Sequence, residues 1–175
     1  KINATTLHPL RGKGAINGRQ WTVFGHPQHA MLPVAATHDM VPKRMYTTGS
    51  ITRQNYSQTD LGARAEFHHI VGALVIELTR GCSPFVRQVN ADSDGNFHDL
   101  DYFYTPEGRE SAPDVLSVTF GDLHELFLDR KVRKATFEGA AIIVGRLTPQ
   151  YAVFHDIVDA YSVSHHHERD DVIKH

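Results

Sequence analysis

Two short acidic clusters, each directly after an apolar run, are the residues of this sequence whose types and spacing suit chemistry. The first is Asp122-Leu123-His124, after the run 115–120, and the second begins at Asp156, after the run 151–154. In extended or turning backbone, residues i and i+2 project to the same side, so a carboxylate and an imidazole can bind one cation together. If the two runs are neighbouring parallel strands, Asp122, His124 and Asp156 converge at one edge of a sheet, and the pattern predicts a metal site there.

The donor types narrow the choice of metal. A mixed carboxylate and imidazole set suits manganese, iron or zinc better than calcium or magnesium alone. Two metals about 3.5–4 Å apart need a bridging carboxylate, for which Asp156 is the candidate. The alternative is structural: a single Asp after a strand is usually a helix cap or turn former, and a lone His is usually structural too. Two such clusters after two apolar runs favour the metal site.

The elements that must position these residues are expected to form a βαβ-type arrangement, with strands at 115–120 and 151–154 and a helical stretch beginning at Glu125. Upstream, the residue patterns at 21–24 and 85–89 predict short strands. The nearly continuous apolar stretch at 67–79 predicts a strand buried on both faces. Asp94-Gly95 predicts a turn before a strand at 97–104, and the polar stretch 106–113 predicts a linker. We therefore expect a β-rich region over 1–110 and a second domain beginning at 111.

Composition excludes several classes of protein. The chain has 175 residues, a formal net charge of −2 and 41% hydrophobic residues, which fit one domain or two small ones and argue against wholesale disorder. Its single cysteine, Cys82, cannot form an internal disulfide and fits a reducing cytoplasm. No apolar run approaches the ~20 residues of a membrane span. The sequence has no initiator Met, signal peptide or terminal stop signal, so we expect an internal piece of a longer polypeptide.

The stretches Phe120-Gly121-Asp122-Leu123-His124 and Phe154-His155-Asp156-Ile157-Val158-Asp159 resemble the first two motifs of the calcineurin-like metallophosphoesterases. The tail 161–167 resembles, more narrowly, a phage branch of that superfamily that includes DNA-degrading and DNA-transfer nucleases of T5-like phages. Stretches 65–69 and 86–92 are similar to that branch as well. The motifs cover only about 40 residues, whereas the branch-level likeness covers most of the chain.

The resemblance implies an α/β fold, a mixed β-sandwich flanked by helices, of which residues 111–175 are the first part. It implies that Asp122 and His124 bind one metal, that Asp156 bridges two, and that Asp159 has a supporting catalytic role. The metals implied are two Mn²⁺, with Mg²⁺, Fe²⁺ or Zn²⁺ as alternatives, and the reaction is phosphodiester hydrolysis by metal-activated water. Two departures stand out: His155 replaces the usual Gly, and the later His-containing motifs are absent.

Two further groups of residues are candidates for substrate contact. His165, His166 and His167 are consecutive, and on a helix they point about 100° apart, so at most two reach one ligand. We favour His165 and His166 as catalytic residues, with a solvated helix face as the alternative. The basic residues Arg130, Lys131, Arg133 and Lys134 are weaker candidates for DNA contact, since a basic run is often only a solvated helix face.

Three functions follow as hypotheses. The first is a metal-dependent nuclease, with DNA as its substrate, acting in the cytoplasm of a host cell, with no membrane partner and with homo-oligomers possible. The second is a non-catalytic DNA-binding or assembly module of a phage with vestigial motifs. The third is a nucleotide phosphomonoesterase.

Overall fold

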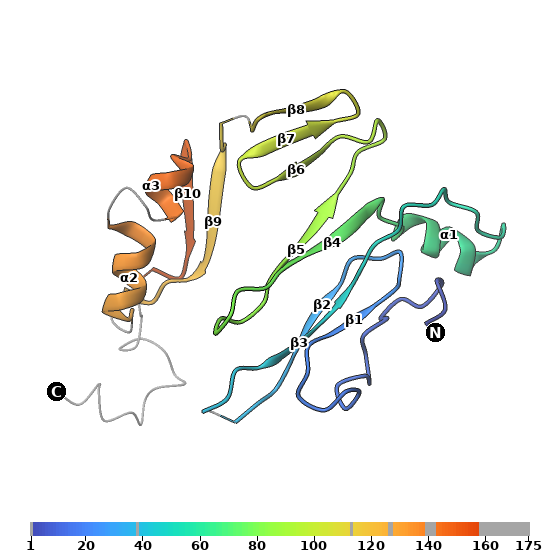
Figure 1. Cartoon of the computed structure of the whole chain (residues 1–175), viewed down its shortest axis with the longest axis horizontal. Helices are drawn as coiled ribbons and strands as arrows, with labels where there is room; N and C mark the ends of the chain where they lie inside the picture. Colours follow the sequence, from blue (N-terminus) through green and yellow to red (C-terminus); the bar gives the residue numbers. More distant parts are fainter. Residues whose placement is uncertain (1, 38, 113, 126–127, 139–142, 158–175) are drawn as a thin grey trace. The chain divides into compact units, whose positions relative to one another are not determined.

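The computed structural model describes residues 2–37, 39–112, 114–125, 128–138 and 143–157. The chain divides into two compact units, Lys1–Ala112 and Pro113–His175. The described elements are mostly short strands in several sheets, with a few helices (Figure 1). The expected mixed α/β class is confirmed at this level.

The first sheet of the first unit has the strand order β1-β3-β2. β1 (Thr22–Phe24) lies parallel to β3 (Lys43–Thr47), and β2 (Met31–Val34) lies antiparallel to β3 on its other side. β3 is central, so Met45 and Thr47 are fully buried. Pro33 lies in β2, where an edge strand tolerates its missing N–H. Residues 21–24 are thus the strand that their sequence predicts, apart from Trp21.

Buried polar side chains fasten this sheet to its surroundings. The Lys43 side chain is buried, and its ammonium group donates to the carbonyls of Gly14 (3.2 Å), Ile16 and Gly18 (3.0 Å). The Thr47 hydroxyl accepts from the Ala30 N–H and donates to the Gln28 carbonyl, at 2.6 Å each. Buried polar groups are costly unless they are hydrogen-bonded, so these contacts stabilise the loops around β3.

β4 (Gly72–Glu77) and β5 (Phe85–Asn90) form an antiparallel pair. The Gln88 amide on β5 donates to the carbonyls of Ala30 (3.1 Å) and Thr47 (3.0 Å), which joins this pair to the first sheet. The prediction of β5 is confirmed. The prediction for residues 67–79 is wrong at both ends, because the strand covers only Gly72–Glu77 and none of its residues is buried.

The residues before β4 form a helix instead, α1 (Asp60–Phe67). The Thr59 hydroxyl caps it by accepting the Gly62 N–H, and Asp60 lies in its first turn, where a negative charge is favourable. His68 ends the helix, and His69, which follows, is buried. Both histidines thus precede β4 rather than forming part of the strand predicted at 67–79.

A meander of three strands completes the unit: β6 (Phe97–Asp99), β7 (Tyr102–Thr105) and β8 (Gly108–Ser111). The predicted strand at 97–104 is instead a hairpin, turned at Leu100 with φ 52°. The predicted linker at 106–113 is also wrong, because β8 pairs with β7. Asp92 closes the expected turn by accepting the N–H groups of Asp94 (2.9 Å) and Asn96 (2.8 Å).

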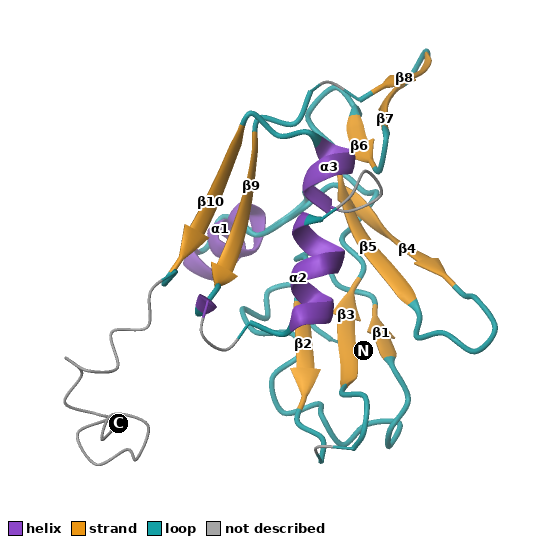
Figure 2. Ribbon diagram, turned by 90° about the vertical axis from the view of Figure 1, so that its left-hand side faces the viewer, coloured by secondary structure: helices purple, strands orange, loops and turns teal. Residues whose placement is uncertain are grey.

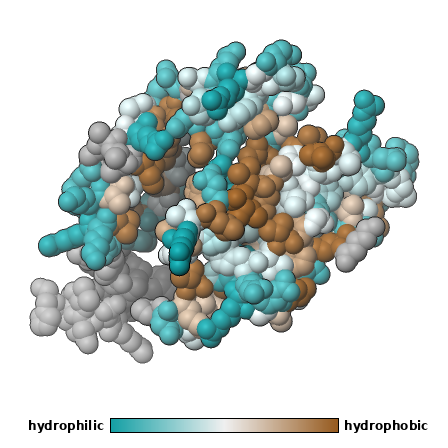
Figure 3. Space-filling model, viewed as in Figure 1, coloured by the Kyte–Doolittle hydropathy of each residue, from teal (hydrophilic) through white to brown (hydrophobic). Residues whose placement is uncertain are grey.

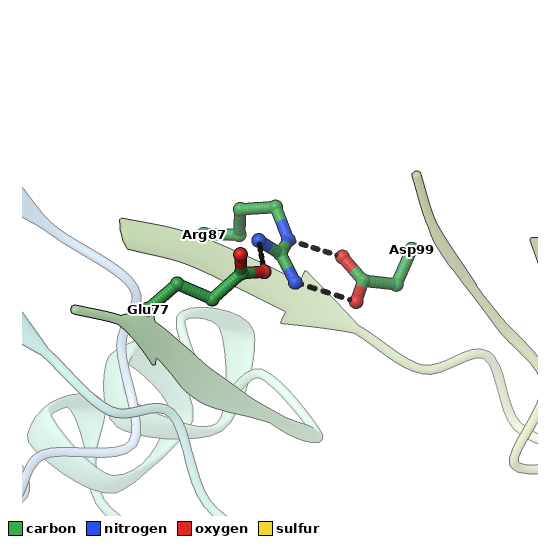
Figure 4. A network of polar contacts seen from close by, with 3 residues as sticks. All are labelled: Glu77, Arg87 and Asp99. Carbon is green, nitrogen blue, oxygen red and sulfur yellow. Dashed lines mark hydrogen bonds and ion pairs between the residues drawn. The ribbon is translucent and has the colours of Figure 1, made fainter. Parts of the chain in front are cut away.

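An arginine holds β4, β5 and β6 together (Figure 4). Arg87 of β5 makes a bidentate contact with Asp99 of β6, Nε to Oδ1 at 2.5 Å and Nη2 to Oδ2 at 2.9 Å, and also pairs with Glu77 of β4. The hydrogen bonds that Arg87 donates to Asp99 and then to Glu77 raise the pKa of the guanidinium above its ordinary value. The guanidinium is therefore a permanent positive charge that neutralises part of two carboxylates.

The second unit contains β9 (Ser117–Asp122), α2 (Arg130–Phe137), α3 (Ile143–Leu147) and β10 (Tyr151–His155). β9 and β10 are parallel neighbours (Figure 2), which confirms the expected strand-helix-strand order. Phe120 and Phe154 stack across the two strands, with ring centroids 5.1 Å apart, and Phe137 of α2 packs against both at 5.6 and 5.8 Å. This aromatic triad fastens the helix to the sheet.

Hydrophobic side chains also reach the surface of the first unit. Figure 3 shows them gathered where Figure 1 places β4 and β5. Ile76, Leu78 and Phe85 are among the exposed apolar residues of this region. None of the helices among the described residues has the length and apolar character needed to cross a membrane.

Candidate metal centre

The two acidic clusters lie at adjacent strand ends. Asp122 is the last residue of β9, and His155, which precedes Asp156, is the last residue of β10 and lies in register with Asp122. Backbone pairing continues beyond the strands: the Leu123 and His124 N–H groups donate to the carbonyls of His155 and Asp156, both at 3.0 Å. The chain therefore carries both clusters to the same edge of one parallel sheet, where open α/β sheets place ligands.

Both clusters turn through an unusual backbone conformation at this edge. His124 has φ 45° and Asp156 has φ 42°. A left-handed φ is uncommon outside glycine, and Asp and His are among the residues that adopt it most readily. The two residues lie opposite each other across one hydrogen bond, so the chain turns at two of the three predicted metal ligands.

The side chains of Asp122 and His124 approach each other, with His124 Nε2 4.0 Å from Asp122 Oδ2. They are 62% and 43% exposed, and Asp156 is exposed as well. No set of three His, Cys, Asp or Glu side chains within the described residues gathers closely enough to hold an ion. The structure thus brings the side chains of Asp122 and His124 together. Asp156 follows the end of the neighbouring strand, and its side chain does not complete a three-ligand site with them.

The donor chemistry of this edge fits a divalent transition metal. Carboxylate oxygens and an imidazole nitrogen together suit Mn²⁺, Fe²⁺ or Zn²⁺, and the exposed edge leaves them open to solvent. Asp122 and His124 are the pair that would hold such an ion. Asp156 would be the further ligand, because it follows the adjacent strand.

Helix α2 presents the basic residues. Asp129 caps it by accepting the N–H groups of Lys131 (2.8 Å) and Val132 (3.1 Å). Arg133 is committed to ion pairs with Glu125 (2.6 Å) and Glu138 (3.8 Å). Arg130, Lys131 and Lys134 are exposed and form no ion pair with another described residue. They are spaced i, i+1 and i+4, so they share one side of the helix.

The remaining predicted site residues, Asp159, His165 and His166, lie outside the described residues.

Comparison with known proteins adds one relative. The chain is similar to Protein A1 of Escherichia phage T5. The two are 36% identical over 143 residues, which cover 79% of this chain and 26% of Protein A1. The chain thus spans about a quarter of the length of that relative. No protein-family model matches the chain. No solved structure matches it either.

This match confirms the expected similarity to a protein of a T5-like phage. The name Protein A1 specifies no activity, so it leaves the metallophosphoesterase motifs and the metal ligands as predictions.

Sequence reasoning missed a second polar site, in the first unit. A cavity of about 860 Å³ is lined by residues that include His26, Arg53, Tyr56 and His69. Its lining comes from four separate stretches of the chain, 2–4, 25–27, 48–56 and residue 69. No pattern of residue spacing predicts that such distant residues lie together. The only signal in the sequence is Gly25-His26-Pro27, whose residue types predict no more than a surface loop.

Proposed function

We propose that this chain contributes part of a two-metal phosphodiesterase centre that acts on DNA. The observation that carries the proposal is the parallel pairing of β9 with β10, which takes both acidic clusters to one sheet edge. The positive φ of His124 and Asp156 is compatible with the proposal, since both clusters turn at the same level of the two strands. The finer fold we propose is the metallophosphoesterase sandwich that the two motifs resemble.

Divalent cations bound at such a centre lower the pKa of a water and neutralise charge on the phosphoryl oxygens. In this proposal Asp122 and His124 hold one cation, and the Asp156 carboxylate is shared between two. The resemblance alone assigns a supporting role to Asp159 and a catalytic role to His165 or His166, which lie outside the described residues. The rings of Phe120 and Phe154, two residues before each cluster, pack with the ring of Phe137 and help to hold β9 and β10 side by side.

The proposed substrate contact is α2. Arg130 and Lys131 lie in its first turn, where positive charge opposes the helix dipole and costs about 0.3–1 kcal/mol. A stability argument alone favours acidic residues there, and α2 has none in that turn. Arg130 and Lys131 are therefore better explained as contacts for phosphate groups than as helix-stabilising residues. Lys134 lies in the last turn, where a positive charge is favourable to the helix, and we add it to the proposed contact only because it lies on the same side of α2.

The test is DNA cleavage by the chain in Mn²⁺ and in EDTA, compared with p-nitrophenyl phosphate as the monoester. We expect weak cleavage of DNA that needs Mn²⁺ and that falls about 100-fold or more in Asp122→Asn, because removing a direct ligand costs more than removing an outer-shell partner. Asp94→Asn removes a carboxylate of the same charge from an exposed turn and is the matched control.

The other outcomes separate the rival functions. Cleavage of the monoester alone indicates a nucleotide phosphatase. Absence of cleavage of either substrate, together with Mn²⁺ binding that Asp122→Asn leaves unchanged, indicates an assembly module with vestigial motifs. DNA cleavage that survives both EDTA and Asp122→Asn contradicts the proposed centre.

A further inference from the structure

The cavity of the first unit has the size of a small-molecule site. Its volume of about 860 Å³ lies within the roughly 300–1,000 Å³ typical of ligand pockets. All of its lining residues belong to the first unit. The proposed metal centre is in the second unit, so the cavity is a separate site.

Two buried histidines form a fixed part of the cavity wall. His26 accepts the Gln28 N–H at Nδ1 (3.2 Å), so its proton is on Nε2, which donates to the Asn3 carbonyl (3.1 Å). His69 donates from Nε2 to the Thr52 carbonyl (3.1 Å) and accepts the Tyr56 hydroxyl at Nδ1 (2.8 Å). All four ring nitrogens are occupied, so these rings shape the cavity rather than bind its ligand.

The Tyr56 ring is held in one orientation by the same contacts. Its hydroxyl donates to His69, and its ring packs edge-on against the His69 ring, with centroids 5.7 Å apart. Burial, and then the charge of Glu66, raise the pKa of the Tyr56 phenol, so it remains a neutral donor at neutral pH. A ring held by a hydrogen bond and by an edge-on contact with the same neighbour is a partly pre-organised aromatic surface.

The groups left over for a ligand are positive or neutral. Arg53 and Asn55 are exposed, and neither has a hydrogen bond or ion pair with a described residue. The hydroxyls of Ser50 and Thr52 bond to each other (2.7 Å), so one hydroxyl proton remains to be donated. No Asp or Glu lines the cavity among the residues that the structure describes. A guanidinium, an amide and a hydroxyl without a carboxylate are suited to a phosphate group.

We propose that this cavity binds a nucleoside 5′-monophosphate group, with its phosphate on Arg53 and its base on the ring of Tyr56. The residues that line the cavity indicate a ligand with a phosphate group and an aromatic ring. The choice of a nucleotide as that ligand rests on the proposed function. The same group occurs in a free mononucleotide and at the 5′-phosphorylated end of a DNA strand. Both fit an open cavity of this size.

The test is calorimetric titration of the whole chain in EDTA with dAMP, adenosine, inorganic phosphate and a 5′-phosphorylated oligonucleotide. We expect dAMP to bind more tightly than adenosine or phosphate alone, because each lacks half of the recognised group. Arg53→Gln is expected to weaken dAMP about 10- to 100-fold, as for removal of a charge-assisted hydrogen bond. Arg80→Gln, an exposed arginine outside the cavity, leaves binding unchanged.

The role of the ring is tested by Tyr56→Phe and Tyr56→Leu. Only Tyr56→Leu removes the stacking surface, so we expect it to bind dAMP more weakly than Tyr56→Phe does. The fluorescence of Trp21, which is in the first unit, reports whether each variant is folded. Equal binding of phosphate and dAMP, or equal affinity in Arg53→Gln and Arg80→Gln, overturns the proposal. Asp122→Asn is expected to bind dAMP as the parent does, so loss of cleavage and loss of this binding are separable.

Binding of the 5′-phosphorylated oligonucleotide together with dAMP assigns the strand end as the source. Binding of dAMP alone assigns the free nucleotide. Failure of both overturns the site.

Discussion

The two units of this chain are stabilised by different means. In the first, buried polar residues are as prominent as buried apolar ones: Thr22, His26, Lys43, Thr47 and His69 are all within it. In the second, none of the described residues is buried, and a half-buried aromatic triad joins helix and sheet. The first unit therefore depends on hydrogen bonds inside it, and the second on ring packing and a strand pair.

The difference bears on where function is expected. In the first unit, hydrogen bonds hold the side chains of His26, Tyr56 and His69 in the wall of the cavity. The acidic edge of the second unit is exposed, and its backbone turns at His124 and Asp156. The positions of its side chains are therefore set by the direction of the backbone rather than by burial. Substitutions of similar chemistry should accordingly have unequal effects in the two units.

The largest effect is expected from Gly72→Ala in the first unit. A Cβ at Gly72 overlaps the Val89 carbonyl oxygen and meets the His29 ring at 3.0 Å. The backbone of a paired strand cannot yield easily, so we expect a loss of about 3 kcal/mol in the free energy of unfolding. Urea denaturation followed by Trp21 fluorescence measures it.

Gly25→Ala is its control, because nothing lies within 4 Å of a Cβ there. We expect no loss, and a small gain is allowed because alanine restricts the unfolded chain. Equal destabilisation by both substitutions is evidence against close packing around β4.

The next effect compares two ion pairs. Arg87→Gln leaves Asp99 and Glu77 facing each other without a cation, at a site where the Arg87 and Asp99 side chains are 15% and 17% exposed. We expect a loss of about 1–2 kcal/mol, between the values for surface and buried pairs. Arg133→Gln breaks a pair that is 52% exposed on both sides, and about 0.5 kcal/mol or less is expected. If the two losses in urea denaturation are equal, the contrast between the units is not supported.

A smaller effect is a pH dependence confined to the first unit. Burial lowers the pKa of His26 below its ordinary 6.5. Above pH 6.5 the ring is neutral in both states and stability is complete. As the pH falls below 6.5, the unfolded chain takes up a proton that the folded ring resists, so the free energy of unfolding decreases. Urea midpoints across pH 5–8 should show this slope reduced in His26→Gln and retained in His8→Gln, an exposed histidine.

The smallest effect concerns the basic residues of α2. Lys131→Gln with Lys134→Gln is expected to weaken DNA binding a few-fold and to reduce its salt dependence by about one unit of slope for each phosphate that the variant no longer neutralises. The measurement is fluorescence anisotropy of a labelled duplex at several salt concentrations. An unchanged salt slope shows that this side of α2 does not bind DNA.

The sequence allowed the prediction of the parallel strand pair because its signals are local. Apolar runs at 115–120 and 151–154, with an intervening helical stretch, predict β9 and β10 and the shared edge of Asp122 and Asp156. The first unit was less predictable. The apolar character of 67–79 favours one strand. In the structure, however, Thr59 caps a helix that ends at His68, so the first residues of this stretch belong to the end of that helix.

Long-range pairing explains the other differences. β8 has four exposed residues and no apolar alternation, so only its pairing with β7 makes it a strand. The cavity is assembled from stretches up to 67 residues apart, Ile2 to His69, and no periodicity records such proximity. Of the predicted ligands, Asp122 and His124 lie close together as expected, and the closure of the site by Asp156 remains a prediction.

The most direct measurement of the central claim is paramagnetic broadening of the NMR spectrum of the ¹⁵N-labelled chain by substoichiometric Mn²⁺. If the ends of β9 and β10 form one metal centre, the amide signals of Leu123, His124 and Asp156 broaden first and together, and Asp122→Asn removes the effect. Broadening that spares these three amides, or that is unchanged in Asp122→Asn, contradicts the metal centre.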